Sequence, residues 1–204
     1  MAQLKLTKTE LRLQQVKLAQ LQKYLPTLQL KKALLQAEVN QSALEILQLR
    51  KEFTMNREVL RNNAALFSER NSGGFFSSIS VQGVKTTSEN IAGVEVPVFQ
   101  EVTFAEPTYS LFDTPVWYES AMEEMRAMII SQEKVVIGER KKAALEKELR
   151  DVSIRVNLFE KISIPRAKEN MKRIKIFLGD QQLAAVSQAK VSKKKILERA
   201  LHDN

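Results

Sequence analysis

Residues 4–67 read LKLTKTELRLQQVKLAQLQKYLPTLQLKKALLQAEVNQSALEILQLRKEFTMNREVLRNNAALF. Counted in steps of seven from Leu4, nine of the ten positions in this stretch are apolar, which is the repeat of a coiled-coil helix. The positions are Leu4, Leu11, Leu18, Leu25, Lys32, Val39, Ile46, Phe53, Leu60 and Phe67. A heptad row of this length predicts one long helix that packs its apolar side against a partner helix.

The companion row, three residues further on in each heptad, is less uniform, because polar residues such as Ser42 and Asn63 alternate with leucines. Residues flanking both rows are mostly Lys, Arg and Gln, so a single partner helix would cover most of the apolar stripe. Pro26 lacks a backbone N–H and its ring clashes with the preceding turn. We therefore expect a kink or break near Leu25 that does not end the helix.

A second helical region begins at Val116 and continues to the C-terminus, with apolar residues spaced mainly by three, four and seven. Pro165 interrupts this region and Gly179 weakens it. If the two helices pair antiparallel, Leu4 lies opposite Gly179 and residues 180–204 project beyond the partner helix. Such an overhang either serves as a binding element or frays as a solvated tail.

The connection between the two helices has a different composition. FFSSISVQGV and IAGVEVPVFQEVTF are rich in β-branched and aromatic residues, which predicts short strands, and Pro97 favours an edge position. The expected fold class is all-α dominated: a long antiparallel two-helix coiled coil with a small β-hairpin-containing knob packed on the coiled-coil end. Its three parts are the helix of residues 1–67, the knob of residues 68–115 and the helix of residues 116–204.

No catalytic, cofactor or metal site is expected. The chain has no Cys, and its one histidine, His202, stands near the end of the chain, so zinc–thiolate sites and histidine-based triads are excluded. The segment GVKTT begins at Gly83 and faintly resembles a phosphate-binding loop, but Val84 stands where that loop requires Lys. No run approaches 18 apolar residues, so we expect no direct membrane insertion, and a chain without Cys is compatible with a reducing cytoplasm.

Charge divides the chain into basic ends and an acidic middle. Residues 1–67 carry 11 Lys and Arg against 5 Asp and Glu, residues 68–115 carry 2 against 6, and residues 116–204 carry 19 against 13. The basic ends suit acidic protein patches, an anionic surface or nucleic acid, but the lysines after residue 189 lack the interleaved aromatic residues that single-strand binding uses. A structural coiled-coil scaffold and a basic RNA-binding helical hairpin remain alternatives on these grounds.

Three short motifs occur in order along the chain. The stretch RVNLFEKISIPRAKENMKRIK contains Arg155, Val156, Asn157, Glu160, Ile164, Pro165 and Arg166. A Gly-Val-x-Val-Pro element runs from Gly93 to Pro97, and Thr7, Lys8 and Leu11 stand near the start. In this order the motifs resemble those of the D subunits of V-type and A-type rotary ATPases, and the resemblance spans essentially the whole chain.

The resemblance implies a non-catalytic central rotor shaft that transmits torque between the catalytic hexamer and the membrane ion-translocating rotor. Its implied partners are the catalytic A and B subunits, a socket subunit on the membrane rotor, and a small F subunit. The F subunit is expected at the middle of the paired helices near the knob. The expected hexamer contacts are Leu4, Lys8, Arg166, Lys190, Lys193, Lys194, Lys195 and Arg199.

Overall fold

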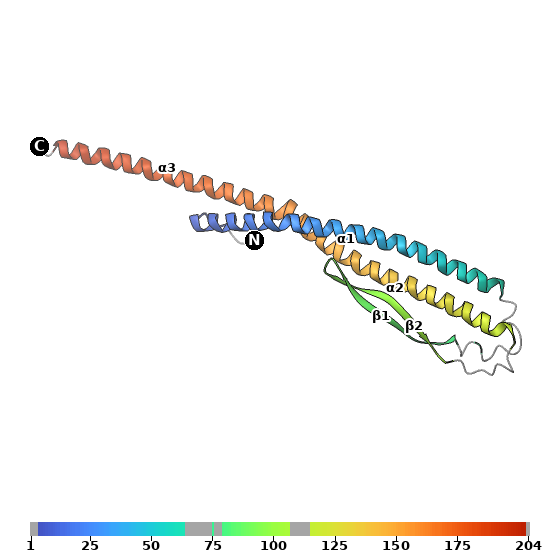
Figure 1. Cartoon of the computed structure of the whole chain (residues 1–204). Helices are drawn as coiled ribbons and strands as arrows, with labels where there is room; N and C mark the ends of the chain where they lie inside the picture. Colours follow the sequence, from blue (N-terminus) through green and yellow to red (C-terminus); the bar gives the residue numbers. More distant parts are fainter. Residues whose placement is uncertain (1–3, 64–74, 76–78, 107–114, 203–204) are drawn as a thin grey trace. The chain divides into compact units, whose positions relative to one another are not determined.

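A computed structural model describes residues 4–63, 75, 79–106 and 115–202, with side chains up to residue 196. The chain divides into two compact units, each built from separate stretches of sequence. Unit 1 comprises Met1–Leu30 and Ser153–Asn204, and unit 2 comprises Lys31–Val152. The order of elements is two long helical regions with a two-stranded hairpin between them, so the expected fold class is confirmed (Figure 1).

The first helix, α1 (Lys8–Asn62), begins at a polar cap. The Glu10 N–H donates a hydrogen bond of 3.2 Å to Thr7 Oγ1, and Thr7 therefore satisfies one of the unpaired donors of the first turn. The helix continues through Pro26 without a break. The prediction that Pro26 does not end the helix is therefore confirmed, and of the kink or break expected near Leu25 a break is absent.

In unit 2, α1 packs against α2 (Trp117–Asn157), which runs antiparallel beside it (Figure 1). The buried α1 residues fall on the two predicted heptad rows: Leu35, Val39, Ser42, Ile46 and Leu60. Leu145 and Val152 are their fully buried counterparts on α2. Polar residues of the companion heptad row also contact α2. Asn56 Nδ2 donates a hydrogen bond to the Ala127 carbonyl oxygen, and Asn63 Nδ2 donates one to Glu124 Oε2.

The hairpin comprises β1 (Val81–Ile91) and β2 (Val94–Phe104), paired antiparallel. Ala92 and Gly93 both have positive φ angles, 52° and 79°, which is the backbone of a tight hairpin turn. The Gly93 N–H donates to Asn90 Oδ1 at 3.0 Å and closes that turn. The sheet has two strands in the described part of the chain, so both are edge strands there, as the position of Pro97 indicated.

We expected the hairpin to pack on the coiled-coil end. It lies instead along the side of the helix pair in unit 2. A Cβ on Gly93 would lie 3.7 Å from Lys31 Nζ, whereas at the base of the hairpin the Arg126 guanidinium lies 5.0 Å from the Phe104 ring centroid. Eleven strand residues extend roughly 36 Å. This length is similar to the rise of the helix pair from the level of Lys31 to the level of Arg126. Val96 and Val102 are buried by this packing.

The expected first strand was placed too early in the sequence. Phe75 and Ile79 lie before β1 and belong to a hydrophobic cluster with Tyr118 and Met122 at the start of α2. The Phe75 and Tyr118 rings meet edge to face, with centroids 5.1 Å apart. Their apolar character, which suggested a strand, therefore reflects burial in this cluster.

In unit 1, the interruption of the second helical region takes the form of a π-helix, Leu158–Ser163, between α2 and α3 (Ile164–His202). Pro165 cannot donate a backbone hydrogen bond and would clash with the carbonyl four residues earlier in a regular α-helix. The Ile164 N–H bonds five residues back to the Phe159 carbonyl oxygen, which is the wider spacing of a π-helix. Gly179 lies within α3 without ending it.

Candidate partner-binding surfaces

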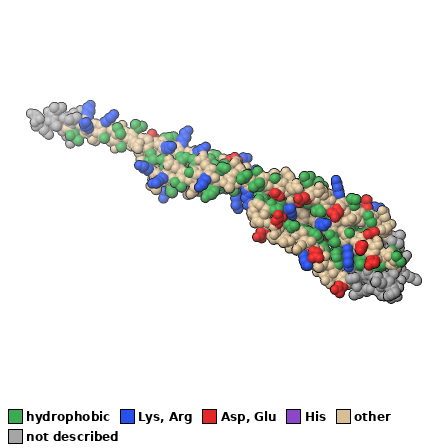
Figure 2. All heavy atoms as spheres, in the orientation of Figure 1, with side chains coloured by type: hydrophobic (Ala, Val, Ile, Leu, Met, Phe, Trp, Pro, Cys, Tyr) green, Lys and Arg blue, Asp and Glu red, His purple; other side chains and the backbone are tan. Residues whose placement is uncertain are grey.

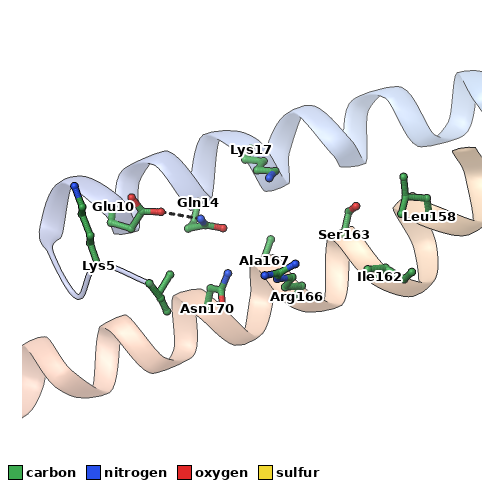
Figure 3. Close-up of a pocket in the computed structure, with 11 residues that line it drawn as sticks. Lys5, Glu10, Gln14, Lys17, Leu158, Ile162, Ser163, Arg166, Ala167 and Asn170 are labelled. Carbon is green, nitrogen blue, oxygen red and sulfur yellow. Dashed lines mark hydrogen bonds between the residues drawn. The ribbon is translucent and has the colours of Figure 1, made fainter. Parts of the chain in front are cut away.

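A groove in unit 1 lies between the start of α1 and the π-helix with the first turns of α3 (Figure 3). Its volume is about 610 Å³. The cap at Thr7 positions the segment before α1 on one side, and the π-helix positions the other. The residues that line the groove are Leu4, Lys5, Glu10, Gln14, Lys17, Leu158, Ile162, Ser163, Arg166, Ala167 and Asn170.

Positive charge dominates this groove, because Lys5, Lys17 and Arg166 line it against the single carboxylate of Glu10. That carboxylate accepts a hydrogen bond of 2.8 Å from Gln14 Nε2. Within the described part of the chain, none of the three cationic side chains forms an ion pair. The groove therefore presents unpaired cations to any partner that reaches it.

The walls beside these cations are partly apolar. Leu158 and Ile162 are 43% and 55% exposed, although both are large aliphatic side chains. They lie on the π-helix, where the altered hydrogen-bond spacing rotates side chains away from their α-helical positions. Figure 3 shows Ala167 and Asn170 on α3 facing the α1 side of the groove.

The second candidate surface is the part of α3 that extends beyond the start of α1. Every side chain of residues 181–196 is exposed, so this stretch is a helix without a partner helix. It carries large aliphatic residues as well as lysines. Leu183, Val186, Val191 and Ile196 are between 54% and 69% exposed. Because they recur at angles all around the helix, this segment has no single apolar face to pack on one neighbour.

A third surface lies on the outer side of α1 in unit 2. Leu44, Leu47, Met55 and Val59 are exposed there by 46% to 68%, and their spacing of three, four and eight residues places them along one side of the helix. Large apolar residues exposed along one side of a helix are a candidate interaction surface.

The predicted hexamer contacts are distributed over more than one of these surfaces. Leu4 and Arg166 line the same groove. Lys8 lines a neighbouring shallow groove together with Gly179, which agrees with the expected antiparallel pairing. Lys190, Lys193, Lys194 and Lys195 lie on the exposed stretch of α3, and the Arg199 side chain lies outside the described residues.

The motif residues near the π-helix have mainly structural positions. Val156 is buried at 3% exposure, whereas Arg155 and Asn157 are exposed at the end of α2. Glu160 accepts a hydrogen bond of 3.1 Å from Gln29 Nε2 on α1, which ties the π-helix to the partner helix. Ile164 and Pro165 begin α3.

The hairpin motif is also explained by local structure. Gly93 takes the left-handed backbone conformation that other residues adopt at a cost, and Pro97 pairs with Ser88 in a two-stranded ribbon where missing ladder bonds are tolerated. These two positions therefore shape the hairpin, and neither of them lines the groove.

Sequence reasoning missed six polar residues of the groove: Lys5, Glu10, Gln14, Lys17, Ser163 and Asn170. One signal was available in the sequence. The expected antiparallel pairing places Lys17 opposite Arg166, and two facing cations repel each other unless a partner supplies negative charge. No group of three or more potential metal ligands occurs among the described residues. No helix in the described ranges is long and apolar enough to cross a membrane.

The family model that describes the ATP synthase D subunit matches residues 10–194. The chain belongs to this D-subunit family. The D subunit of V-type ATP synthase from Chlamydia caviae is 42% identical over 199 residues, which cover 97% of this chain and 96% of that protein. Its namesake in Chlamydia trachomatis serovar L2 is 44% identical over 200 residues, covering 96% of this chain and 97% of the relative.

The D-subunit match includes the hairpin, the π-helix and most of the unpartnered stretch of α3. The family expected from the three ordered motifs is thereby confirmed. Among the predicted contacts, Arg166, Lys190, Lys193 and Lys194 fall within the matched range. Leu4, Lys8, Lys195 and Arg199 fall outside it.

Proposed function

We propose that this member of the D-subunit family is the central rotor shaft of a V-type ATPase or ATP synthase. It transmits torque between the catalytic A/B hexamer and the membrane ion-translocating rotor. The match to the family over nearly the whole chain carries this proposal. A long helix pair is suited to the task, because each helix is stiffened by packing on the other.

The shaft itself catalyses no reaction in this proposal. Torque arises from conformational changes of the surrounding hexamer, and the shaft contributes its position. The groove in unit 1 and the unpartnered stretch of α3 offer cations and aliphatic side chains, without a histidine, cysteine or pair of free carboxylates for acid–base work. These surfaces suit protein partners.

We assign unit 1 to the catalytic A and B subunits. Residues 181–196 are exposed on all sides of α3, so a ring of partner subunits can cover them more completely than one helix can. The lysines of this stretch, Lys190, Lys193, Lys194 and Lys195, together with Arg199, would meet acidic groups of those subunits. Leu4, Lys8 and Arg166 would contact them nearer to the start of α1.

The small F subunit is assigned to unit 2. The exposed side of α1 between Leu44 and Val59 lies in the half of α1 that ends at Asn62, and it offers the apolar area that such a partner would cover. The end of the shaft that does not enter the A/B hexamer would engage the socket subunit on the membrane rotor. The protein would therefore work peripheral to the membrane, on its cytoplasmic side.

Reconstitution tests this proposal. The purified chain should show no ATP hydrolysis alone, and should assemble with purified A, B and F subunits into one complex by size-exclusion chromatography. Adding the chain to membranes that lack only this protein should restore ATP-driven ion transport. Hydrolysis by the isolated chain, or transport that stays absent after assembly, would contradict it.

A further inference from the structure

We propose that the groove in unit 1 is an acceptor site for an acidic, amphipathic segment of the catalytic A or B subunits. The inference rests on the proposed function, and adds to it a defined site and the chemistry of the segment that binds there. The helix pair of unit 1 carries an unusual arrangement of charge at this groove.

Lys17 on α1 and Arg166 on α3 line the same groove from opposite helices, and Lys5 joins them from the segment before α1 (Figure 3). Two cations that line the same groove repel each other. Glu10 is the one carboxylate of the groove, and it is held by Gln14. A carboxylate supplied from outside would relieve this repulsion and gain hydrogen bonds to charged donors.

Unit 2 of the same chain pairs the charges between its two helices internally. There the cations at the helix–helix interface are paired with carboxylates of the other helix: Lys31 with Glu148, Arg50 with Glu139, Lys134 with Glu52, and Lys141 with Glu45. In the described part of unit 1, no such ion pair links the two helices. The unpaired cations of the groove are therefore a local departure from the pattern of this chain.

Charge over the whole of unit 1 favours an acidic partner. Its sequence carries 17 Lys and Arg against 6 Asp and Glu, whereas unit 2 carries 15 against 18. Figure 2 shows Lys and Arg side chains predominating along α3. A field of one sign steers an acidic surface toward unit 1, and the groove offers that surface a place to insert.

The apolar walls favour a protein segment over a small anion. Leu158 and Ile162 border the cations and are about half exposed. Phosphate would pair with the cations and leave both aliphatic side chains in water. A segment with acidic side chains toward Lys17 and Arg166, and apolar side chains toward the π-helix, would satisfy the charges and cover the aliphatic surface together.

The test compares two full-length variants that lose the same charge. The groove variant carries Lys17→Gln with Arg166→Gln, and the control carries Lys23→Gln with Lys172→Gln, which changes exposed cations of the same two helices outside the groove. Affinity for the purified A/B hexamer is measured over a range of salt concentrations. We expect about a tenfold loss for the groove variant and less than about threefold for the control.

The salt dependence should also separate the two variants. Affinity of the groove variant should fall less steeply with salt than that of the control, because two screened contacts are gone. Equal losses in both variants would assign the effect to overall charge and overturn the proposal. Unchanged affinity in the groove variant would overturn it as well. If the unaltered chain failed to bind the hexamer at all, the proposed function would be wrong rather than the site.

Two further measurements distinguish the occupant. Because the chain has no Cys, Asn170→Cys provides a unique attachment point for a photo-crosslinker at the groove. The expected adduct is an Asp- or Glu-containing segment of the catalytic A or B subunits, and an adduct on F alone would contradict the proposal. Pyrophosphate serves as the small-anion probe. Submillimolar pyrophosphate binding that the groove variant loses, with hexamer affinity unchanged, would make the groove a small-anion site and overturn the proposal.

Discussion

The two units of this chain use one motif, a pair of antiparallel helices, to different ends. In unit 2 the interface buries large side chains such as Leu35 and Leu145, and ion pairs connect the helices on its margins. In unit 1 the buried residues include Val156, Ala167 and Ile174, and the cations that line its groove form no ion pair in the described part of the chain. The ion pairs of unit 2 stabilise its own helix pair. The unpaired cations of unit 1 are available to bind a partner.

The largest expected effect is on assembly. Truncation after Asp180 removes the exposed stretch of α3 and leaves the helix pair intact. Affinity for the A/B hexamer should fall by about a hundredfold or more, because several large aliphatic side chains lose their burial site in the complex. Size-exclusion binding assays with F and with the hexamer give the readout. Binding to F should persist, and unchanged hexamer affinity would show that the stretch is passive.

The next effect concerns the stability of unit 2. Leu145 is fully buried on α2, so Leu145→Ala should lower the free energy of unfolding by about 2–5 kcal/mol through lost contacts and a residual cavity. Leu183→Ala makes the same chemical change at a site that is 69% exposed, and should cost less than about 0.5 kcal/mol. Chemical denaturation followed by circular dichroism measures both. Equal costs would mean that the two regions are not packed differently.

A smaller effect is expected at the hairpin turn. Gly93 has a φ angle of 79°, so Gly93→Ala should destabilise the hairpin by about 1–2 kcal/mol. Ala92→Gly relieves a φ angle of 52° in the same turn and should be neutral or stabilising. Amide hydrogen exchange of β1 and β2 reports the local stability. Faster exchange in the Ala92→Gly variant than in the Gly93→Ala variant would contradict the assigned turn geometry.

The smallest effect belongs to a single ion pair of unit 2. Lys31 Nζ lies 2.8 Å from Glu148 Oε1, and both side chains are one-third exposed. A double-mutant cycle with Lys31→Ala and Glu148→Ala should give a coupling of about 0.2–1 kcal/mol, reduced at high salt. A coupling near zero at low salt would indicate that the interhelical pairs set register without adding stability.

Much of this fold follows from periodicity. The heptad rows placed Val39 and Ile46 in the core, and both are buried, because a spacing of seven keeps side chains on one side of a helix whatever the partner. The start of the first strand was predicted less well. Phe75 and Ile79 are apolar residues of the kind found in strands. They are buried by tertiary packing against the start of α2, which the local sequence pattern does not predict.

The groove illustrates a second limit. Arg166 belongs to a recognisable motif, so sequence could single it out, whereas Lys17 stands among other exposed lysines of α1. Its position opposite Arg166 depends on the antiparallel register, and the opening beside it depends on the π-helix that precedes Pro165. Pro165 predicted an interruption of the helix. That the interruption takes the form of a π-helix depends on packing and could not be predicted from the proline alone.

Hydrogen–deuterium exchange on the full-length chain, alone and bound to the A/B hexamer, tests most directly whether unit 1 is built to bind and unit 2 to hold together. Alone, residues 181–196 should exchange quickly, because this stretch of helix lacks packing, while the core of unit 2 should be protected. On binding, residues 181–196 and the segments around the groove should gain strong protection, with the core of unit 2 unchanged. Protection gained along the outer side of α1 in unit 2, with residues 181–196 still exchanging quickly, would contradict the account.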